Sequence, residues 1–260
     1  MLPYKLNMKI RYQLFALIFL AAMFIGCSED GTSPVNSTSQ TSGGSTTGSG
    51  GSLARFTIAN DYLYIATDHQ LYSYSLSNAA QPEYTGAIPL FGGVETIFAM
   101  GDHLFLGTQN GVLIYNISNA ATPQFVSNYV HITSCDPVVV KGVHAYATLR
   151  TGQQCWRGAN QLDVINISTI SNPYNEKSID LENPIGLGIY QNYLFICDND
   201  KIKCFDISTP GSPSYKSQTA LLGCYDVILK NNTLLAVHSS GVSQYSISPA
   251  GVLTLLSTIK

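Results

Sequence analysis

The stretch Gly111–Ser127, GVLIYNISNAATPQFVS, carries a pattern that returns five times along the chain. Each copy has an aromatic residue or Ile, one further residue, and then Leu or Ile followed by Ser. Successive copies are 41, 50, 40 and 40 residues apart, and a period near forty is typical of repeat architectures. In four copies a proline stands six residues after the Leu or Ile. The copies are Tyr74–Ser77, Tyr115–Ser118, Ile165–Ser168, Phe205–Ser208 and Tyr245–Ser248.

Each repeat unit contains four short apolar or alternating runs separated by turn residues, which indicates four β-strands. One such sheet exposes too much apolar surface to stand alone, so neighbouring units must stack face to face. We therefore predict an all-β, five-bladed β-propeller of four-stranded antiparallel blades, with about 41 residues per repeat. The predicted units are Leu53–Gly93, Val94–Cys135, Asp136–Asn183, Pro184–Cys224 and Tyr225–Lys260. The strands predicted in units two and four are Glu95–Met100, His103–Gly107, Val112–Ile117, Gln124–Val130, Ile185–Tyr190, Tyr193–Asp198, Ile202–Ile207 and Ser214–Thr219.

The sequence is compatible with more than one way of closing the propeller ring. If Arg55–Ala59 is the innermost strand of the first blade and Val252–Thr258 the outermost of the last, no blade mixes strands from both ends. Only packing between the first and last blades would then hold the ring shut. Alternatively, Ser52–Arg55 pairs further out, or an open arc dimerises.

The N-terminus has the features of a secretory signal peptide over residues 1–26. Three positive charges precede Leu14–Ile25, twelve apolar residues that are too few to span a bilayer as a helix. The residues Phe24-Ile25-Gly26-Cys27 that follow resemble the cleavage site of a bacterial lipoprotein precursor, which implies lipid attachment at Cys27. A plain signal peptide with an unrelated cysteine is the alternative. Several acyl chains on one cysteine would give lasting membrane attachment.

Residues 27–52 are predicted to be a flexible tether after the lipidated cysteine. Ser, Thr and Gly fill 19 of the 25 positions from Ser28 to Ser52, so this segment cannot bury enough apolar area to fold. Ser28-Glu29-Asp30 resembles the acidic signal that sends some bacterial lipoproteins to the cell surface, although acidic residues also occur in plain linkers. We expect an outer-membrane lipoprotein whose domain, residues 53–260, faces the cell surface or the periplasm.

The repeat units resemble the LVIVD-repeat family of bacterial propeller-like proteins. Gln161–Ser168, QLDVINIS, and Leu194–Ser208, LFICDNDKIKCFDIS, are the closest segments. The resemblance covers essentially residues 53–260 and implies the propeller fold. It implies almost nothing about activity, because fold alone does not give function.

A ten-residue excess in the third unit falls between Leu149 and Leu162, in the connection from the second to the third strand. This rim loop is the predicted binding site, because Trp and Arg are common in binding hot spots and loops on rigid scaffolds carry recognition. A Trp that simply covers its own blade is the alternative. The candidate ligand-binding residues are Arg150, Gln153, Trp156, Arg157, Asn160 and, on the same rim, Asp136.

Six cysteines occur in the chain. Cys135 and Cys155 are expected on one rim of the third blade, so we predict a disulfide between them in an oxidising compartment. LVIVD-type sequences resemble this chain at both positions. Cys197 and Cys204 face each other if Asp200-Lys201 is the turn, but they can equally be two small buried residues. Cys224 is predicted to be a free thiol.

Catalytic and cofactor motifs are absent from the sequence. No metal-ligand spacing, nucleophile elbow or phosphate loop occurs, so we expect no catalytic residues, no metal and no cofactor. Without residues 1–26 the chain carries 10 basic and 16 acidic residues, a net charge of −6 that argues against nucleic-acid binding. Asp198-Asn199-Asp200 is explained by turn chemistry. A further candidate surface is the ring of blade-start residues Phe91, His131, Asp136, Ile185 and Asp226.

The function expected from these features is a non-enzymatic, surface-tethered propeller that binds a glycan or a protein partner. A polysaccharide-acting enzyme with its site at the central opening is one alternative. A structural subunit of an outer-membrane complex is another.

Overall fold

The computed structural model describes residues 51–130, 137–151 and 159–260. Every described residue belongs to one compact unit, Gly44–Lys260. Within the described ranges, no helix is long and apolar enough to cross a membrane. Several of the predicted sites lie outside these ranges. They are the lipidation site, the rim disulfide and most of the rim loop. The candidate residues outside the described ranges are Cys27, His131, Cys135, Asp136, Gln153, Cys155, Trp156 and Arg157.

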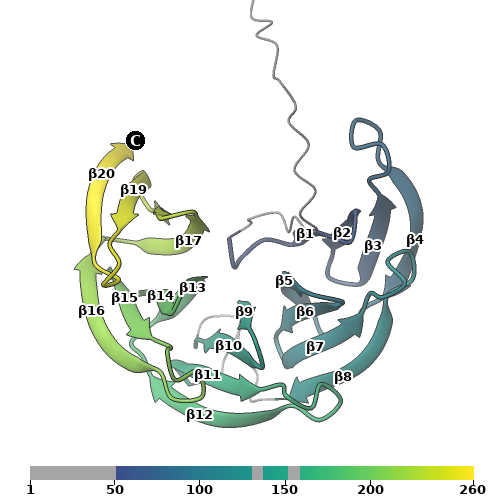
Figure 1. The fold of residues 1–260 in the computed structure, drawn as a ribbon, viewed down its shortest axis with the longest axis horizontal. Coiled ribbons are helices and arrows are strands. Elements are labelled where there is room, and N and C mark those ends of the chain that lie inside the picture. The colour runs from purple at the N-terminus through teal and green to yellow at the C-terminus, as the bar shows by residue number, and fades with distance from the viewer. Residues whose placement is uncertain (1–50, 131–136, 152–158) are drawn as a thin grey trace, which may run out of the picture. The chain divides into compact units, whose positions relative to one another are not determined.

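The described residues form five four-stranded antiparallel sheets, each built from four consecutive strands, which confirms the predicted all-β propeller (Figure 1). Blades 1 and 2 comprise β1 (Phe56–Ala59), β2 (Tyr62–Ala66), β3 (Gln70–Ser75), β4 (Glu83–Pro89), β5 (Val94–Met100), β6 (His103–Thr108), β7 (Gly111–Asn116) and β8 (Gln124–Val130). Blades 3 and 4 comprise β9 (Val138–Lys141), β10 (His144–Leu149), β11 (Gln161–Asn166), β12 (Tyr174–Asp180), β13 (Pro184–Tyr190), β14 (Tyr193–Asp198), β15 (Lys201–Asp206) and β16 (Ser214–Ala220). Blade 5 comprises β17 (Cys224–Lys230), β18 (Thr233–His238), β19 (Gly241–Ile247) and β20 (Leu253–Ile259).

The strand boundaries follow the turn residues of the sequence. All eight strands predicted for blades 2 and 4 are present, and none of their ends differs by more than one residue. The first strand of each blade lies innermost and the fourth lies outermost, as Figure 1 shows. A proline that cannot donate to the ladder therefore precedes an outer strand in four blades, where a missing donor costs least.

The repeated sequence landmark marks a β-bulge in every blade. The register between the third and fourth strands shifts immediately before the landmark aromatic or Ile. Such a bulge bends the strand and increases its local twist. The five shifts fall between Ser73 and Tyr74, Ile114 and Tyr115, Val164 and Ile165, Cys204 and Phe205, and Gln244 and Tyr245.

Adjacent blades pack face to face, and the apolar side chains between them form the core. We call the side of a blade that faces the preceding blade its leading face, and the other side its trailing face. In blade 2, Leu104 and Tyr115 of the leading face pack on blade 1. Phe105 and Ile114 of the trailing face pack on blade 3. Burial of each such side chain contributes about 1.5–3 kcal/mol, so the sheets stabilise one another.

The five blades form an open arc. The second strands of blades 2, 3 and 4 are buried on both faces, whereas β2 and β18 of the end blades alternate between buried and half-buried positions. Figure 1 shows a gap between blade 1 and blade 5, and within the described residues no strand of one packs closely along a strand of the other. No blade mixes strands from both ends, as predicted, but the packing expected between the first and last blades is not made there.

Substitution of Gly111 tests how tightly the third and fourth strands pair. This glycine starts β7 with a φ of 145°, and a Cβ on it would lie 1.9 Å from the carbonyl oxygen of Tyr129. Gly111→Ala is expected to lower the free energy of unfolding by about 2–4 kcal/mol, because β8 must move away. Gly101→Ala is the control, since its φ is also positive, at 55°, but no atom lies within 4 Å of its Cβ. Urea denaturation should show a loss of about 1 kcal/mol there, and equal losses would contradict the steric argument.

Candidate functional site

The rim loop predicted as a binding site joins β10 to β11, and the structure describes only its two ends. Arg150 is half-buried, and its positive charge opposes the rise that burial causes in the pKa of Glu95 on blade 2. Asn160 accepts hydrogen bonds from the backbone N–H and the hydroxyl of Thr151, at 2.9 and 3.1 Å. Asn160 also donates to the carbonyl oxygen of Glu182 at 2.7 Å. Its side chain therefore holds the base of the loop against the end of blade 3.

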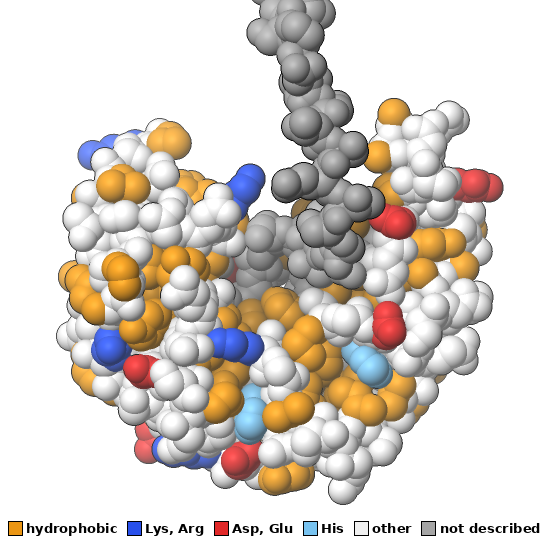
Figure 2. Space-filling view, viewed as in Figure 1, with side chains coloured by type: hydrophobic (Ala, Val, Ile, Leu, Met, Phe, Trp, Pro, Cys, Tyr) orange, Lys and Arg blue, Asp and Glu red, His pale blue; other side chains and the backbone are white. Residues whose placement is uncertain are grey.

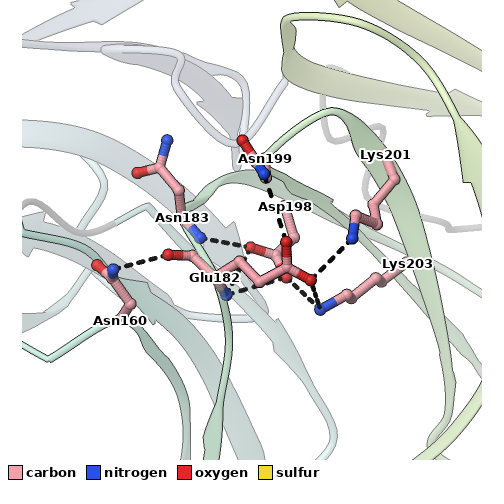
Figure 3. A network of polar contacts seen from close by, with 7 residues as sticks. All are labelled: Asn160, Glu182, Asn183, Asp198, Asn199, Lys201 and Lys203. Atoms are coloured by element: carbon pink, nitrogen blue, oxygen red, sulfur yellow. Dashed lines mark hydrogen bonds and ion pairs between the residues drawn. The ribbon is translucent and has the colours of Figure 1, made fainter.

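A buried carboxylate organises the polar network beside this loop (Figure 3). Asp198, the last residue of β14, is fully buried and accepts the backbone N–H groups of Glu182 and Asn183 at 2.9 and 2.7 Å. The ammonium group of Lys203 lies 2.5 Å from the same carboxylate. A buried charge without such partners is strongly unfavourable. Asp198 therefore fixes the connection from blade 3 to blade 4, a role that turn chemistry alone did not predict.

Glu182 balances the remaining charge of the network. Its carboxylate accepts from Lys201 at 2.7 Å, from Lys203 at 3.4 Å and from the Asn199 amide at 3.3 Å, and these bonds lower its pKa to about 2. Burial is the largest influence on the pKa of Lys203 and would lower it, but the hydrogen bonds and charges of Asp198 and Glu182 together outweigh burial, so that pKa is raised. Two carboxylates and two ammonium groups thus neutralise one another. The arrangement suits a structural clamp better than a site for a charged ligand.

A disulfide between Cys197 and Cys224 joins β14 of blade 4 to β17 of blade 5, with a Cα–Cα distance of 5.3 Å. The prediction of a free thiol at Cys224 is therefore wrong. The sequence shows no evident partner for Cys224, and the bonded cysteine lies 27 residues away in the neighbouring blade. Cys197 pairs in register with Ile202 and not with Cys204, because the turn lies at Asn199-Asp200. Burial raises the pKa of the Cys204 thiol to about 11.

The inner strands surround a central cavity of about 140 Å³. This volume is well below the range of roughly 300–1,000 Å³ that is usual for small-molecule sites. Among the described residues, no group of His, Cys, Asp or Glu is arranged to hold a metal ion. The lining is small or apolar except for two hydroxyl side chains, and it comprises Gly51, Ser52, Ala54, Phe56, Thr57, Ile97, Phe98, Ala99, Val139, Leu187, Gly188, Ile189, Val227 and Leu229.

The segment before β1 crosses this opening and ties distant blades together. The Ser52 hydroxyl donates to Asp226 of blade 5 at 2.9 Å and accepts the backbone N–H of Leu187 of blade 4 at 2.8 Å. Two residues later, the carbonyl oxygen of Ala54 accepts the backbone N–H of Ile97 of blade 2 at 2.9 Å. We call this segment, residues 51–54, the clasp. It links blades 2, 4 and 5 to the start of blade 1.

Asp226 of blade 5 is the acidic residue to which the clasp is hydrogen-bonded. Burial raises the pKa of its carboxyl, and hydrogen bonds from Ser52, Leu53 and Val227 act in the opposite direction. A Cβ on Gly51 or Gly186 would lie 2.1 or 2.3 Å from its carboxylate oxygens, so only glycine fits at both positions. The sequence analysis placed Asp226 in a ring of candidate ligand contacts. In the structure it binds the chain's own backbone.

Among the described residues, no blade covers the leading face of blade 1, which is an apolar surface. Its landmark residue Tyr74 is half-buried, and its ring lies 5.6 Å from that of Tyr84 in an edge-to-face contact. The equivalent pair in blade 2, Tyr115 and Phe125, has the same geometry at 5.7 Å. The landmark residues of the other four blades are at most 5% exposed and pack on the preceding blade; they are Tyr115, Ile165, Phe205 and Tyr245.

The other side chains of this face also correspond to side chains of blade 2 that a neighbouring blade covers. Leu63, Ile65 and Tyr72 of blade 1 are half-buried. They stand 41 residues before Leu104, Leu106 and Leu113, which pack against blade 1. The leading face of blade 1 therefore has the composition of a blade–blade interface.

The trailing face of blade 5, on the other side of the gap, departs from the repeat. Its central position in the second strand is Leu235, which is half-buried. In the other four blades this position holds a large aromatic residue that is fully buried against the following blade; these residues are Tyr64, Phe105, Tyr146 and Phe195. The two end faces thus differ within the described residues, and that of blade 1 keeps the side chains that pack on a preceding blade elsewhere in the arc.

The comparison with protein families finds the family described as LVIVD repeat at residues 92–131 and 186–220. These segments cover blade 2 and most of blade 4. The chain therefore contains LVIVD repeats, which confirms the resemblance noted in the sequence. No curated protein matches the chain.

Solved structures match the fold at low sequence identity. A protein from Lactobacillus plantarum matches with a TM-score of 0.64 and 12% identity, over 76% of this chain and 67% of that one. The periplasmic gluconolactonase PpgL of Pseudomonas aeruginosa matches with a TM-score of 0.63 and 12% identity, over 77% and 67%. A protein of unknown function from Desulfotomaculum acetoxidans matches with a TM-score of 0.64 and 10% identity, over 82% and 69%. At such identities these likenesses concern the fold alone.

Loss of the Ser52 hydroxyl is expected to weaken the clasp. Ser52→Ala leaves the buried Asp226 carboxylate and the Leu187 N–H without this partner, so the free energy of unfolding should fall by about 1–3 kcal/mol. Thermal or urea denaturation measures the change. Ser77→Ala, at an exposed turn position, is the control and should change stability by less than about 0.5 kcal/mol. Similar values for both variants would show that the clasp adds nothing.

The polar network predicts an acid-sensitive contribution to stability. The folded-state pKa of Glu182, about 2, lies below the ordinary value of 4.5, so ionised Glu182 stabilises the fold above pH 4.5. This contribution is lost as the pH falls from 4.5 through about 2. Glu182→Gln should therefore flatten the pH dependence of the unfolding midpoint between pH 5 and 2, whereas the exposed Glu83→Gln should leave its shape unchanged. A wild-type slope in the Glu182 variant would refute the assignment.

Proposed function

For this β-propeller with LVIVD repeats, we propose the function of a lipid-anchored, non-enzymatic scaffold that docks a protein partner on the leading face of blade 1. The observation that supports the partner is the repeat equivalence of that face. The same kind of surface is covered by a sheet four times within the chain, and at blade 1 no sheet of the described ranges lies in front of it. The anchor is proposed at Cys27, on the outer membrane.

The partner suited to this face is a β-sheet with an apolar side. Ile65, Tyr72 and Tyr74 are uncharged, and stacked sheets pack about 10 Å apart through such side chains. The edge-to-face contact of Tyr74 with Tyr84, worth roughly 0.5–1.5 kcal/mol beyond its buried area, already orders these rings before a partner docks. A structural subunit of an outer-membrane complex would fit this proposal.

Three features support a role without catalysis. The central opening is small, and its lining is small or apolar apart from two hydroxyl side chains. The charges of the Asp198 network neutralise one another. The carboxylate of Asp226, beside the opening, accepts hydrogen bonds from the clasp. The gluconolactonase among the matched structures is 12% identical and shares only the fold, so it lends no activity to this chain.

A pair of alanine variants at the landmark position tests the docking face. Phe205→Ala should lower the free energy of unfolding by about 3–5 kcal/mol, because Phe205 is 3% exposed in a filled junction. Tyr74→Ala should cost about 1 kcal/mol or less in the isolated protein, because no blade covers it. A photo-crosslinking amino acid at position 74 should yield one defined protein adduct in cells, and the same group at Tyr174, exposed on blade 3, should not.

Adducts of equal yield and pattern at positions 74 and 174 would overturn the docking face. So would a loss of stability in Tyr74→Ala as large as that in Phe205→Ala, because the face would then be covered within the chain itself.

A further inference from the structure

The most exposed large apolar side chains of the described residues all lie at one end of the strands. Phe91, Val130, Leu222 and Ile259 are 78%, 66%, 73% and 72% exposed, whereas the other exposed large apolar side chains range from 50% to 58%. Phe91 and Leu222 lie in connections from a fourth strand to the next first strand. Val130 and Ile259 are the last residues of the fourth strands β8 and β20. We call these four residues the apolar rim.

The apolar rim occupies a single face of the arc. Strands alternate in direction within each blade, so first strands begin, and fourth strands end, at the same face. Val143, in the turn from β9 to β10, marks the opposite face and is 51% exposed. The rim residues are also spread around the arc, near β4 and β8 on one side and near β16 and β20 on the other (Figure 1). Side chains spread around one face in this way suit an extended surface better than a small ligand.

The proposed tether joins the domain near this face. Gly51 and Ser52 contact Asp226, the third residue of the first strand β17, and β1 begins four residues after Ser52. Residues 28–50, 23 residues rich in Ser, Thr and Gly, lie between the proposed lipid anchor and this point. Such a coil has an r.m.s. reach of roughly 25–30 Å. The anchor would therefore keep the bilayer within reach of the apolar rim.

The geometry points to a lipid surface as the occupant of the apolar rim: the domain rests on the bilayer that carries its anchor, with Phe91, Val130, Leu222 and Ile259 inserted among the lipid headgroups. This inference rests on the lipid anchor of the proposed function. The leading face of blade 1 is the side of a sheet, whereas the apolar rim lies at the ends of the strands. A domain resting on the rim therefore leaves that face available to a protein partner.

The charged side chains considered near this face pair with one another, so the proposed contact with lipid is an apolar one. Arg55 pairs with Asp68 at 2.6 Å, and the Asp198 network neutralises Lys201 and Lys203. Figure 2 shows one face of the domain, on which charged side chains are scattered among apolar and uncharged ones. Attraction to anionic headgroups is therefore not the driving force. Binding should be insensitive to salt and should occur on zwitterionic phosphatidylcholine vesicles.

Depth-dependent quenching on the lipidated full-length protein tests this inference. Trp156 is first replaced in Trp156→Phe, and single reporters are then introduced as Phe91→Trp, Leu222→Trp and Val143→Trp. In vesicles that contain brominated phosphatidylcholine, the reporters at 91 and 222 should lose at least half of their fluorescence. The reporter at 143, on the opposite face, should lose less than a tenth. Unquenched reporters at all three positions on vesicle-bound protein would overturn the inference and leave the anchor intact.

The unlipidated Cys27→Ser protein separates the two proposals. If neither wild type nor Cys27→Ser co-sediments with vesicles, the anchor fails and the inference falls with it. If the anchor holds, residual partitioning of Cys27→Ser should drop about tenfold in Phe91→Ser/Leu222→Ser and stay unchanged in Val143→Ser. A drop caused by added salt, or one equal in both variants, would contradict apolar insertion at this rim.

Discussion

Packing of one four-stranded sheet on the next is the interaction on which the rest of this structure depends. No blade could stay folded alone, because each has two apolar faces and one sheet can cover neither of them. The landmark residues show how strict the requirement is. Tyr115, Ile165, Phe205 and Tyr245 all follow a bulge and all lie buried against the preceding blade. The same constraint leaves an unpaired face at each end of an open arc, and the docking proposal starts from there.

Much of this fold could be predicted because its physical causes are local in sequence. Alternating apolar residues define the strands, and Gly, Asn, Asp and Pro define the turns, so boundaries in blades 2 and 4 differ by no more than one residue. The contacts that were missed join residues far apart in the chain. Cys197 bonds to Cys224 across a blade junction, and Ser52 meets Asp226 over 174 positions. No local pattern records such pairs.

The candidate site could be predicted only in part, for a related reason. Residue type drew attention to Trp156 and Arg157, but residue type does not tell which surface lacks a neighbour. Asn160 and Asp198 illustrate the limit, since both are polar residues near a loop and both hold backbone groups in place. The end of the arc at blade 5 has a signal in the sequence after all. It emerges when the repeats are aligned and Leu235 stands where four blades have a buried aromatic residue.

The assignment of every strand to the sheet of its own repeat has a consequence for the history of such proteins. In a ring closed by strands from both termini, adding or deleting a unit in the gene must preserve a pairing between the two ends of the chain. Here each unit of about forty codons encodes a whole sheet. Duplication or loss of a unit would change the number of sheets without requiring any strand to find a new hydrogen-bonding partner.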